Sequence, residues 1–261
     1  MAEHRTDDGL WVYGVLDGHV AGPPPCRGVD GAHDVELIRH AELAAVASPV
    51  SLEQFGELGL QESLEDLDRL ETLARAHERV LDEALRMGAV VPFRICTVYE
   101  GVERVHEMLE RERRPLAVAL RRLCGMAEWG VKAYRVGPDD GTSATTSAPA
   151  PSGTDYLARK RSARDAAETA RRAVDAAAED VHARLRERAA GAVLSPPQDR
   201  RLSGRDDEMV LNAAYLVADD DAPEFSSLFA DLSQRLRARE GLELTLTGPW
   251  PPYHFSEAAA R

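Results

Sequence analysis

Few side chains in the sequence have both the types and the spacing that catalysis needs, and the first to consider are His77 and Glu78. An imidazole next to a carboxylate could work as a general acid and base. The two residues are consecutive in a segment with helical spacing, however, and consecutive helical positions point about 100° apart and do not face each other. We therefore expect this pair to serve helix packing or surface contact, and we predict no catalytic residue in the chain.

An anion site and a cation site are the next chemical options. Arg94 interrupts an otherwise apolar segment, where an arginine either binds an anionic ligand or pairs with a carboxylate of its own chain. The aspartates 219–221 lack the spaced oxygen ligands and the glycine of a calcium loop, so we expect their charge to favour the amino end of a following helix. The cysteines Cys26, Cys96 and Cys124 have neither zinc-site spacing nor a CxxC pair. We expect no metal and no cofactor, with Cys96 and Cys124 buried as small apolar residues.

Motifs and composition remove other classes of function. The sequence has no GxGxxG turn, no GKS or GKT phosphate loop and no GxSxG nucleophile elbow. A formal net charge of -13 and a pI near 5.1 oppose binding to nucleic acid and to anionic lipid surfaces. Residues 1–8 are polar, and no run approaches the roughly twenty apolar residues of a membrane span. We therefore expect a cytoplasmic protein without membrane attachment.

The elements that carry these side chains predict a mixed α+β fold, beginning with the N-terminal part. Residues 10–16 are apolar and rich in aromatic and β-branched types, which indicates a buried strand. Residues 35–38 and 43–46 could form a hairpin. Between Ser63 and Gly88, apolar residues recur at helical spacing, which predicts an amphipathic helix with a glycine cap at its C-terminal end.

In the middle of the chain the spacing of apolar residues changes. Residues 89–96 form an apolar run in which Pro92 implies a sheet edge or a bulge, because proline cannot donate a ladder hydrogen bond. Residues 101–124 return to helical spacing, and Pro115 is expected to break or kink that helix. Residues 128–136 alternate again and predict a strand.

Beyond residue 136 the composition indicates a connection followed by a long helix. Residues 137–153 are rich in Ser, Thr, Pro, Gly and Ala, which is typical of a disordered linker. Residues 154–190 contain no Gly or Pro and predict one long helix with a thin apolar face. The remaining chain predicts a strand at 209–217, a helix at 222–239 and a last strand at 242–247.

Together these elements predict two domains, the second with a ferredoxin-like fold made of a βαβ half, a helical insertion and another βαβ half. The expected division is 1–88 for an N-terminal α+β domain, 89–136 with 192–247 for the ferredoxin-like domain, 137–153 for the linker, 154–191 for the long helix and 248–261 for a Pro/aromatic tail. Prolines restrict the tail around Trp250, Tyr253 and His254, so docking costs these residues little entropy. They either pack within the chain across the domain boundary or bind a partner.

Short segments spread over almost the whole chain carry a resemblance to a known family. They are WVYGV (11–15), AHERVLDEAL (76–85), VPFRICTVY (91–99), EWGVK (128–132), YLARKR (156–161), LNAAYLV (211–217) and GPWPPYHF (248–255). In this order the segments resemble the gas vesicle accessory protein family GvpL/GvpF, and the proline-rich last segment is the most specific. The family more often has Phe-Gly at the positions of Ile95 and Cys96, which leaves a local detail of the backbone open.

The resemblance implies a role in building gas vesicles, the protein-walled, gas-filled organelles that give buoyancy. It implies a non-enzymatic accessory protein that assists nucleation or assembly of the shell by binding the major shell protein and other accessory proteins. The implied fold is an α+β N-terminal domain and a modified ferredoxin-like C-terminal domain, and the implied location is the cytoplasm and the gas vesicle. The candidate protein-interface residues are Arg94, Trp129, Tyr156, Trp250, Tyr253 and His254.

A rival hypothesis is a small-ligand regulatory module or an unrecognised enzyme on a ferredoxin-like scaffold, because that fold hosts many functions. A deep pocket lined by convergent polar groups would favour the rival. An apolar patch or groove would favour assembly. The oligomeric state stays open at this point.

Overall fold

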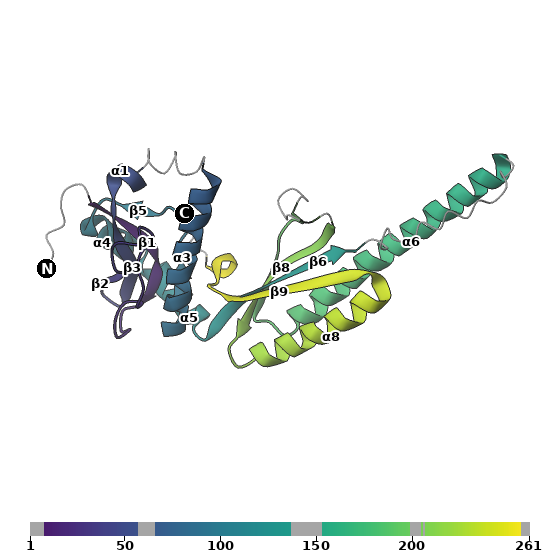
Figure 1. The fold of residues 1–261 in the computed structure, drawn as a ribbon. Helices are drawn as coiled ribbons and strands as arrows, with labels where there is room; N and C mark the ends of the chain where they lie inside the picture. The colour runs from purple at the N-terminus through teal and green to yellow at the C-terminus, as the bar shows by residue number, and fades with distance from the viewer. Residues whose placement is uncertain (1–7, 57–65, 137–152, 199–204, 206, 257–261) are drawn as a thin grey trace. The chain divides into compact units, whose positions relative to one another are not determined.

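The chain divides into two units, each with its own sheet and its own core (Figure 1). The computed structural model describes residues 8–56, 66–136, 153–198, 205 and 207–256. Unit 1 consists of Met1–Glu128 and Pro249–Arg261, and unit 2 consists of Trp129–Gly248. The predicted α+β class is confirmed, whereas the predicted linker at 137–153 lies outside the described residues up to residue 152.

In the described part of unit 1, one sheet contains five strands. They are β1 (Asp8–Asp17), β2 (Glu36–His40), β3 (Leu43–Ser51), β4 (Val90–Pro92) and β5 (Val98–Tyr99). Their order is β2-β3-β1-β4, with β5 also paired to β1, and these pairs are antiparallel. The central strand is buried from Leu10 to Leu16, which explains its continuous apolar sequence. The predicted first strand and the predicted hairpin are confirmed.

The described part of unit 1 also contains four α-helices and one short 3-10 helix. They are α1 (Leu52–Phe55), α3 (Leu67–Met87), α4 (Val102–Arg111), α5 (Arg113–Leu123) and the short 3-10 helix η2 (Tyr253–Phe255). Helix α3 begins after Asp66, whose carboxylate accepts hydrogen bonds from the N–H groups of Asp68 and Arg69. Such a cap contributes about 1 kcal/mol. The helix ends before Gly88, as predicted, while the predicted start at Ser63 lies outside the described residues.

The predicted place of residues 89–96 is wrong. Strand β4 pairs with β1, so these residues do not open a C-terminal βαβ half, and the boundary between the units follows Glu128. The physical reason is burial, because Val90 and Val91 are completely buried and Val90 belongs to the core of unit 1. Strand β4 does end the sheet, as Pro92 indicated.

Two further details of unit 1 differ from expectation. The break between α4 and α5 lies at Glu112, ahead of Pro115, because proline is tolerated in the first turn of a helix. Cys124, expected to be buried, is exposed, since it follows the last turn of α5 as its C-cap. Cys96 is half-buried.

In the described part of unit 2, a four-stranded sheet has the order β7-β8-β6-β9. The elements in chain order are β6 (Met126–Arg135), α6 (Gly153–Arg186), β7 (Gly191–Leu194), β8 (Glu208–Ala218), α8 (Ala222–Glu240) and β9 (Leu242–Trp250). Helices α6 and α8 lie side by side on one face of this sheet (Figure 1), where Val131, Tyr215 and Phe225 are completely buried. The predicted strands and helices are confirmed here, and the finer ferredoxin-like assignment stays a prediction.

Helix α6 is the long helix that the composition predicted. Its 34 residues span about 50 Å at 1.5 Å per residue. The C-terminal half packs on α8 and β8 through a stripe that includes Val174, Val181 and Leu185. Every residue from 159 to 173 is exposed, and Figure 1 shows this part of α6 extending beyond the sheet of unit 2.

Candidate functional site

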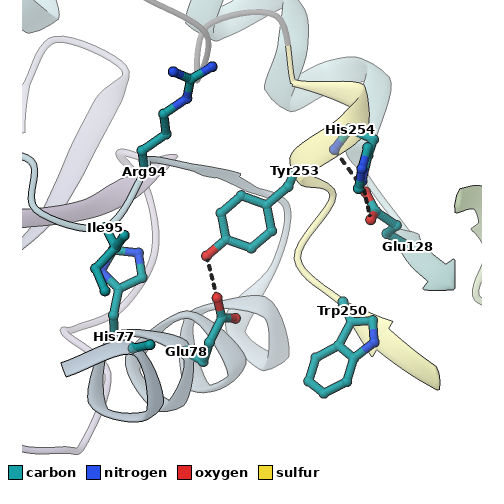
Figure 2. Close-up of a pocket in the computed structure, with 9 residues that line it drawn as sticks. His77, Glu78, Arg94, Ile95, Glu128, Trp250, Tyr253 and His254 are labelled. Carbon is teal, nitrogen blue, oxygen red and sulfur yellow. Dashed lines mark hydrogen bonds and ion pairs between the residues drawn. The ribbon is translucent and has the colours of Figure 1, made fainter. Parts of the chain in front are cut away.

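A cavity of about 700 Å³ lies beside helix α3 in unit 1 (Figure 2). It is lined by Ala74, His77 and Glu78 from α3, Arg94 and Ile95 from the segment between β4 and β5, Glu128 from β6, and Trp250, Tyr253 and His254 from the last residues of β9 and from η2. The lining therefore joins segments from four distant parts of the sequence. Four of the six residues predicted at protein interfaces meet here: Arg94, Trp250, Tyr253 and His254.

Helix α3 positions its lining residues by burying the adjacent face of its surface. Its buried side chains pack with those of the sheet in one core, among them Leu73, Val80 and Leu81. Each such side chain removed from water contributes roughly 1.5–3 kcal/mol. These buried side chains fix the rotation of α3 about its own axis. This rotation brings His77 into the core and leaves Glu78 half-buried at the cavity.

The imidazole of His77 is a structural cross-link. The indole Nε1–H of Trp11 donates to His77 Nδ1 at 3.0 Å, so the proton lies on Nε2, which donates to the Phe93 carbonyl oxygen at 3.2 Å. Burial lowers the pKa of His77 to about 4, which keeps the ring neutral at neutral pH. Both ring nitrogens are occupied, in agreement with the packing role expected from the sequence.

Glu78 binds the aromatic segment, which consists of residues 250–255 at and after the end of β9. The Tyr253 hydroxyl donates to Glu78 Oε1 at 2.8 Å. Burial, together with the charge of Glu78, raises the pKa of the Tyr253 phenol far above its usual range, so that it stays a donor. Burial also raises the pKa of Glu78. Tyr253 thus packs within unit 1, one of the two alternatives for the tail.

Glu128 holds the same segment at its next residue. The backbone N–H of His254 donates to Glu128 Oε2 at 2.9 Å, and His254 Nδ1 lies 2.7 Å from Oε1. The hydrogen bond that the His254 side chain donates to the Glu128 carboxylate raises the pKa of His254. Pro251, Pro252 and Phe255 are buried around these contacts. The segment is therefore fixed by two carboxylates and by burial of its neighbours.

The His254–Glu128 pair predicts a pH dependence for the docking of this segment. Because the folded pKa of His254 lies above the ordinary 6.5, the pair stabilises fully below about pH 6.5, and this contribution is lost as the pH rises through the folded pKa. Since His254 is partly exposed, we expect less than about 1 kcal/mol. Hydrogen exchange of residues 249–256, corrected for intrinsic rates, should be faster at pH 8.5 than at pH 6.0. The variant His254→Phe should lack this difference, and an equal difference in both proteins would contradict the assignment.

The free surface of the cavity is mostly apolar, because its polar groups bind one another or the core. Ala74, Ile95 and the Trp250 indole supply this surface, and Trp250 is 39% exposed. Among the described residues, Arg94 is exposed and has no ion-pair partner, and Figure 2 shows its guanidinium directed away from Glu78. The cavity can accept an apolar or aromatic group, with Arg94 available to an anion nearby. This arrangement favours contact over bond-making.

The other two predicted interface residues lie outside unit 1. Trp129 packs on the core of unit 2 with its ring 6.2 Å from that of Phe225, and its buried Nε1 has no partner in the described part of the chain. Tyr156 falls in α6, but its side chain lies outside the described residues. Their interface role stays a prediction. Sequence reasoning missed Ala74 and Glu128 as lining residues, since no local pattern pairs Glu128 with His254, 126 positions away.

Two findings on the described residues bear on other functions. No helix among them is both long and apolar enough to cross a membrane. Within the same ranges, no three side chains of His, Cys, Asp or Glu gather closely enough to hold a metal ion.

Comparison with known sequences gives a family match over almost the whole chain. A family model described as "Gas vesicle synthesis protein GvpL/GvpF" matches residues 9–257. Gas vesicle protein L of Streptomyces sp. (strain CB03234) is 35% identical over 260 residues, which cover 97% of this chain and 95% of that protein. Gas vesicle protein F2 of Halobacterium salinarum is 25% identical over 255 residues, which cover 96% and 93% of the two chains.

Two crystal structures have a similar fold. The gas vesicle protein GvpF from Anabaena sp. PCC7120 superposes with a TM-score of 0.67 at 18% identity, over 96% of both chains. GvpF from Microcystis aeruginosa gives a TM-score of 0.61 at 19% identity, over 95% of this chain and 99% of that one. At these identities the likeness establishes the fold.

Proposed function

Because the chain belongs to the gas vesicle synthesis protein GvpL/GvpF family, we propose that it assists nucleation or growth of the gas vesicle by binding the major shell protein and other accessory proteins. The match of the family model to residues 9–257 carries this proposal, since it assigns a gas vesicle accessory role to nearly the full chain. The proposed action is non-covalent and needs no cofactor.

The cavity beside α3 is the proposed docking site for a partner side chain. Its free walls are apolar, and the aromatic segment that supplies Trp250 is restrained by proline and by two carboxylates. A restrained surface loses little conformational entropy when it binds. Tryptophan is also the residue type that most often dominates the energy of protein interfaces. We therefore propose that Trp250 anchors the partner.

The rival small-ligand function has one observation in its favour, which is the size of the cavity, since about 700 Å³ lies within the range of ligand pockets. The polar groups of the lining do not converge on a free centre, however. Glu78 binds Tyr253, Glu128 binds His254, and both nitrogens of His77 are occupied. A small polar ligand would find Arg94 alone unpaired among the described lining residues.

Trp250→Ala tests the proposal with little effect on the fold, because Trp250 is 39% exposed. We expect binding to the purified major shell protein to weaken by about 2 kcal/mol, roughly thirtyfold. In a host whose copy of the gene is deleted, vesicles counted by electron microscopy should return with the wild-type gene and fall with the variant. Val118→Ala, which changes an exposed apolar residue of α5, is the matched control. Normal vesicles in the deletion host, together with no binding to the shell protein, would refute the proposal.

A further inference from the structure

Helix α6 exposes a concentration of positive charge in an otherwise acidic chain. The part from 159 to 173, called the basic arm below, holds six basic side chains and two acidic ones, which leaves a net charge of +4. Since the whole chain carries -13, the rest carries -17. Every residue of the basic arm is exposed. At 1.5 Å per residue the arm presents about 22 Å of helix to solvent.

Most of this charge is not neutralised within the described chain. Arg171 pairs with Glu208, and Arg172 pairs with Glu168 one turn away. The basic residues nearer the start of the arm, Arg159, Lys160, Arg161 and Arg164, have no ion-pair partner among the described residues. Like charges this close on one helix destabilise it by a few tenths of a kcal/mol per pair. Their arrangement therefore favours an external acidic partner.

The basic arm also has a stripe of exposed alanines beside its charged side chains, called the alanine stripe below. In the packed half of α6, the core-facing positions Val174, Ala177, Val181 and Leu185 are buried. At the same helical spacing the arm has only alanine, and these alanines are exposed: Ala163, Ala166, Ala167, Ala170 and Ala173. A row of methyl groups buries too little to hold the arm against its own unit, but it allows the backbone of another helix to approach closely.

We propose that the basic arm docks an acidic helix of a partner protein, with the alanine stripe as the contact and the cations beside it as the selective element. Flanking charges choose the partner and its orientation in this kind of helix pairing, while the small apolar stripe adds modest affinity. The proposal rests on the proposed function only in taking the partner to be another protein of vesicle assembly.

Other occupants fit the arm less well. The arm of a second copy carries the same +4 and would be repelled. A long polyanion such as DNA would meet the -17 of the remaining chain as well as the arm. A lipid surface would need large apolar residues to insert, and the stripe between 163 and 173 offers only alanine.

The test uses the full chain and a synthetic helical peptide with an alanine stripe flanked by glutamates. We expect fluorescence anisotropy to show binding in about 50 mM NaCl that weakens about tenfold in about 500 mM NaCl. Reversal of the unpaired charges in K160E/R161E/R164E should weaken binding at least about tenfold at low salt, and neutralisation in K160Q/R161Q/R164Q should have an intermediate effect. Circular dichroism should show unchanged helix content, because glutamate and glutamine have helix propensities close to those of lysine and arginine.

The matched control reverses three exposed arginines of α5 and changes the net charge by the same amount. The variant R114E/R121E/R122E should bind the acidic peptide as the wild type does. Equal binding of a lysine-flanked peptide, or unchanged binding by K160E/R161E/R164E, overturns the proposal. Tighter arm-dependent binding to duplex DNA, to phosphatidylglycerol vesicles or to a second copy of the chain overturns it too.

Complementation separates this proposal from the proposed function. If gene deletion removes vesicles and the charge-reversed arm restores them fully, only the docking of an acidic helix fails. If deletion leaves vesicles normal and the protein does not bind the shell protein, the proposed function fails while the peptide result stands. We expect the arm variant to restore fewer vesicles than R114E/R121E/R122E.

Discussion

Replacement of His77 by leucine is expected to lower the free energy of unfolding by roughly 4 kcal/mol, because it leaves two buried groups without partners at about 1–3 kcal/mol each. Those groups are the Trp11 Nε1–H and the Phe93 carbonyl oxygen, which the neutral imidazole joins across the core of unit 1. Leucine retains apolar volume, so the loss reports hydrogen bonding more than a cavity. Urea unfolding followed by circular dichroism measures it, and His19→Leu, at an exposed position, is the matched control.

The same residue gives the wild-type protein a dependence on acid. The folded pKa of His77 is about 4 and its ordinary value is 6.5, so its contribution is complete above pH 6.5 and is lost as the pH falls toward 4. The loss amounts to about 3 kcal/mol for a shift of this size. The leucine variant should lack this part of the acid sensitivity. A leucine variant as stable as wild type at pH 7, or equally acid-sensitive, would contradict the cross-link.

Phe255→Ala is expected to release the aromatic segment and remove the cavity, although Phe255 does not line it. Phe255 is 7% exposed, and truncation of a buried phenylalanine costs about 3–5 kcal/mol. The segment it anchors supplies Trp250, Tyr253 and His254. Hydrogen exchange of residues 253–256 should accelerate at least about hundredfold, since local opening follows the lost docking energy.

Comparison of Phe255→Ala with Trp250→Ala separates the docking of the aromatic segment on unit 1 from the contact that Trp250 would make with a partner. Both variants should weaken binding to the shell protein, but only Phe255→Ala should change exchange in the segment, because Phe255 is 7% exposed whereas Trp250 is 39% exposed. Unchanged exchange in Phe255→Ala would mean that the contacts of Glu78 and Glu128 suffice to hold the segment, contrary to this expectation.

Elements with a strong apolar period could be predicted from the sequence. Helix α3 shows three-and-four spacing ended by Gly88, and β1 shows an uninterrupted apolar run, because the packing of each leaves a local pattern. The pairing of β4 with β1 left no such local pattern in the sequence. Residues 90–92 are equally apolar whichever sheet takes them, and only the complementary edge of β1 decides. Strand β7 was missed because it has only four residues, three half-buried and one exposed, and such a short strand at a sheet edge carries little signal.

The candidate site was predictable in its residues but not in its assembly. Aromatic side chains held by prolines marked Trp250 and Tyr253, and an arginine in an apolar run marked Arg94. The partner of Tyr253 is Glu78, 175 positions earlier, and no spacing rule connects them. Cys96 has φ of 67°, a left-handed conformation that glycine, the residue expected there from the resemblance, adopts without strain.

Unit 1 is interrupted in the sequence, with 129–248 placed between its two pieces, and this has a consequence for synthesis. While a ribosome makes the chain, the sheet and α3 can fold early, but Glu78 and the apolar wall beside it wait for residues 250–255. The cavity is therefore completed only after the whole of unit 2 has been made. A nascent or prematurely ended chain therefore lacks the cavity at which we propose that a partner docks, and only a completed chain can offer it.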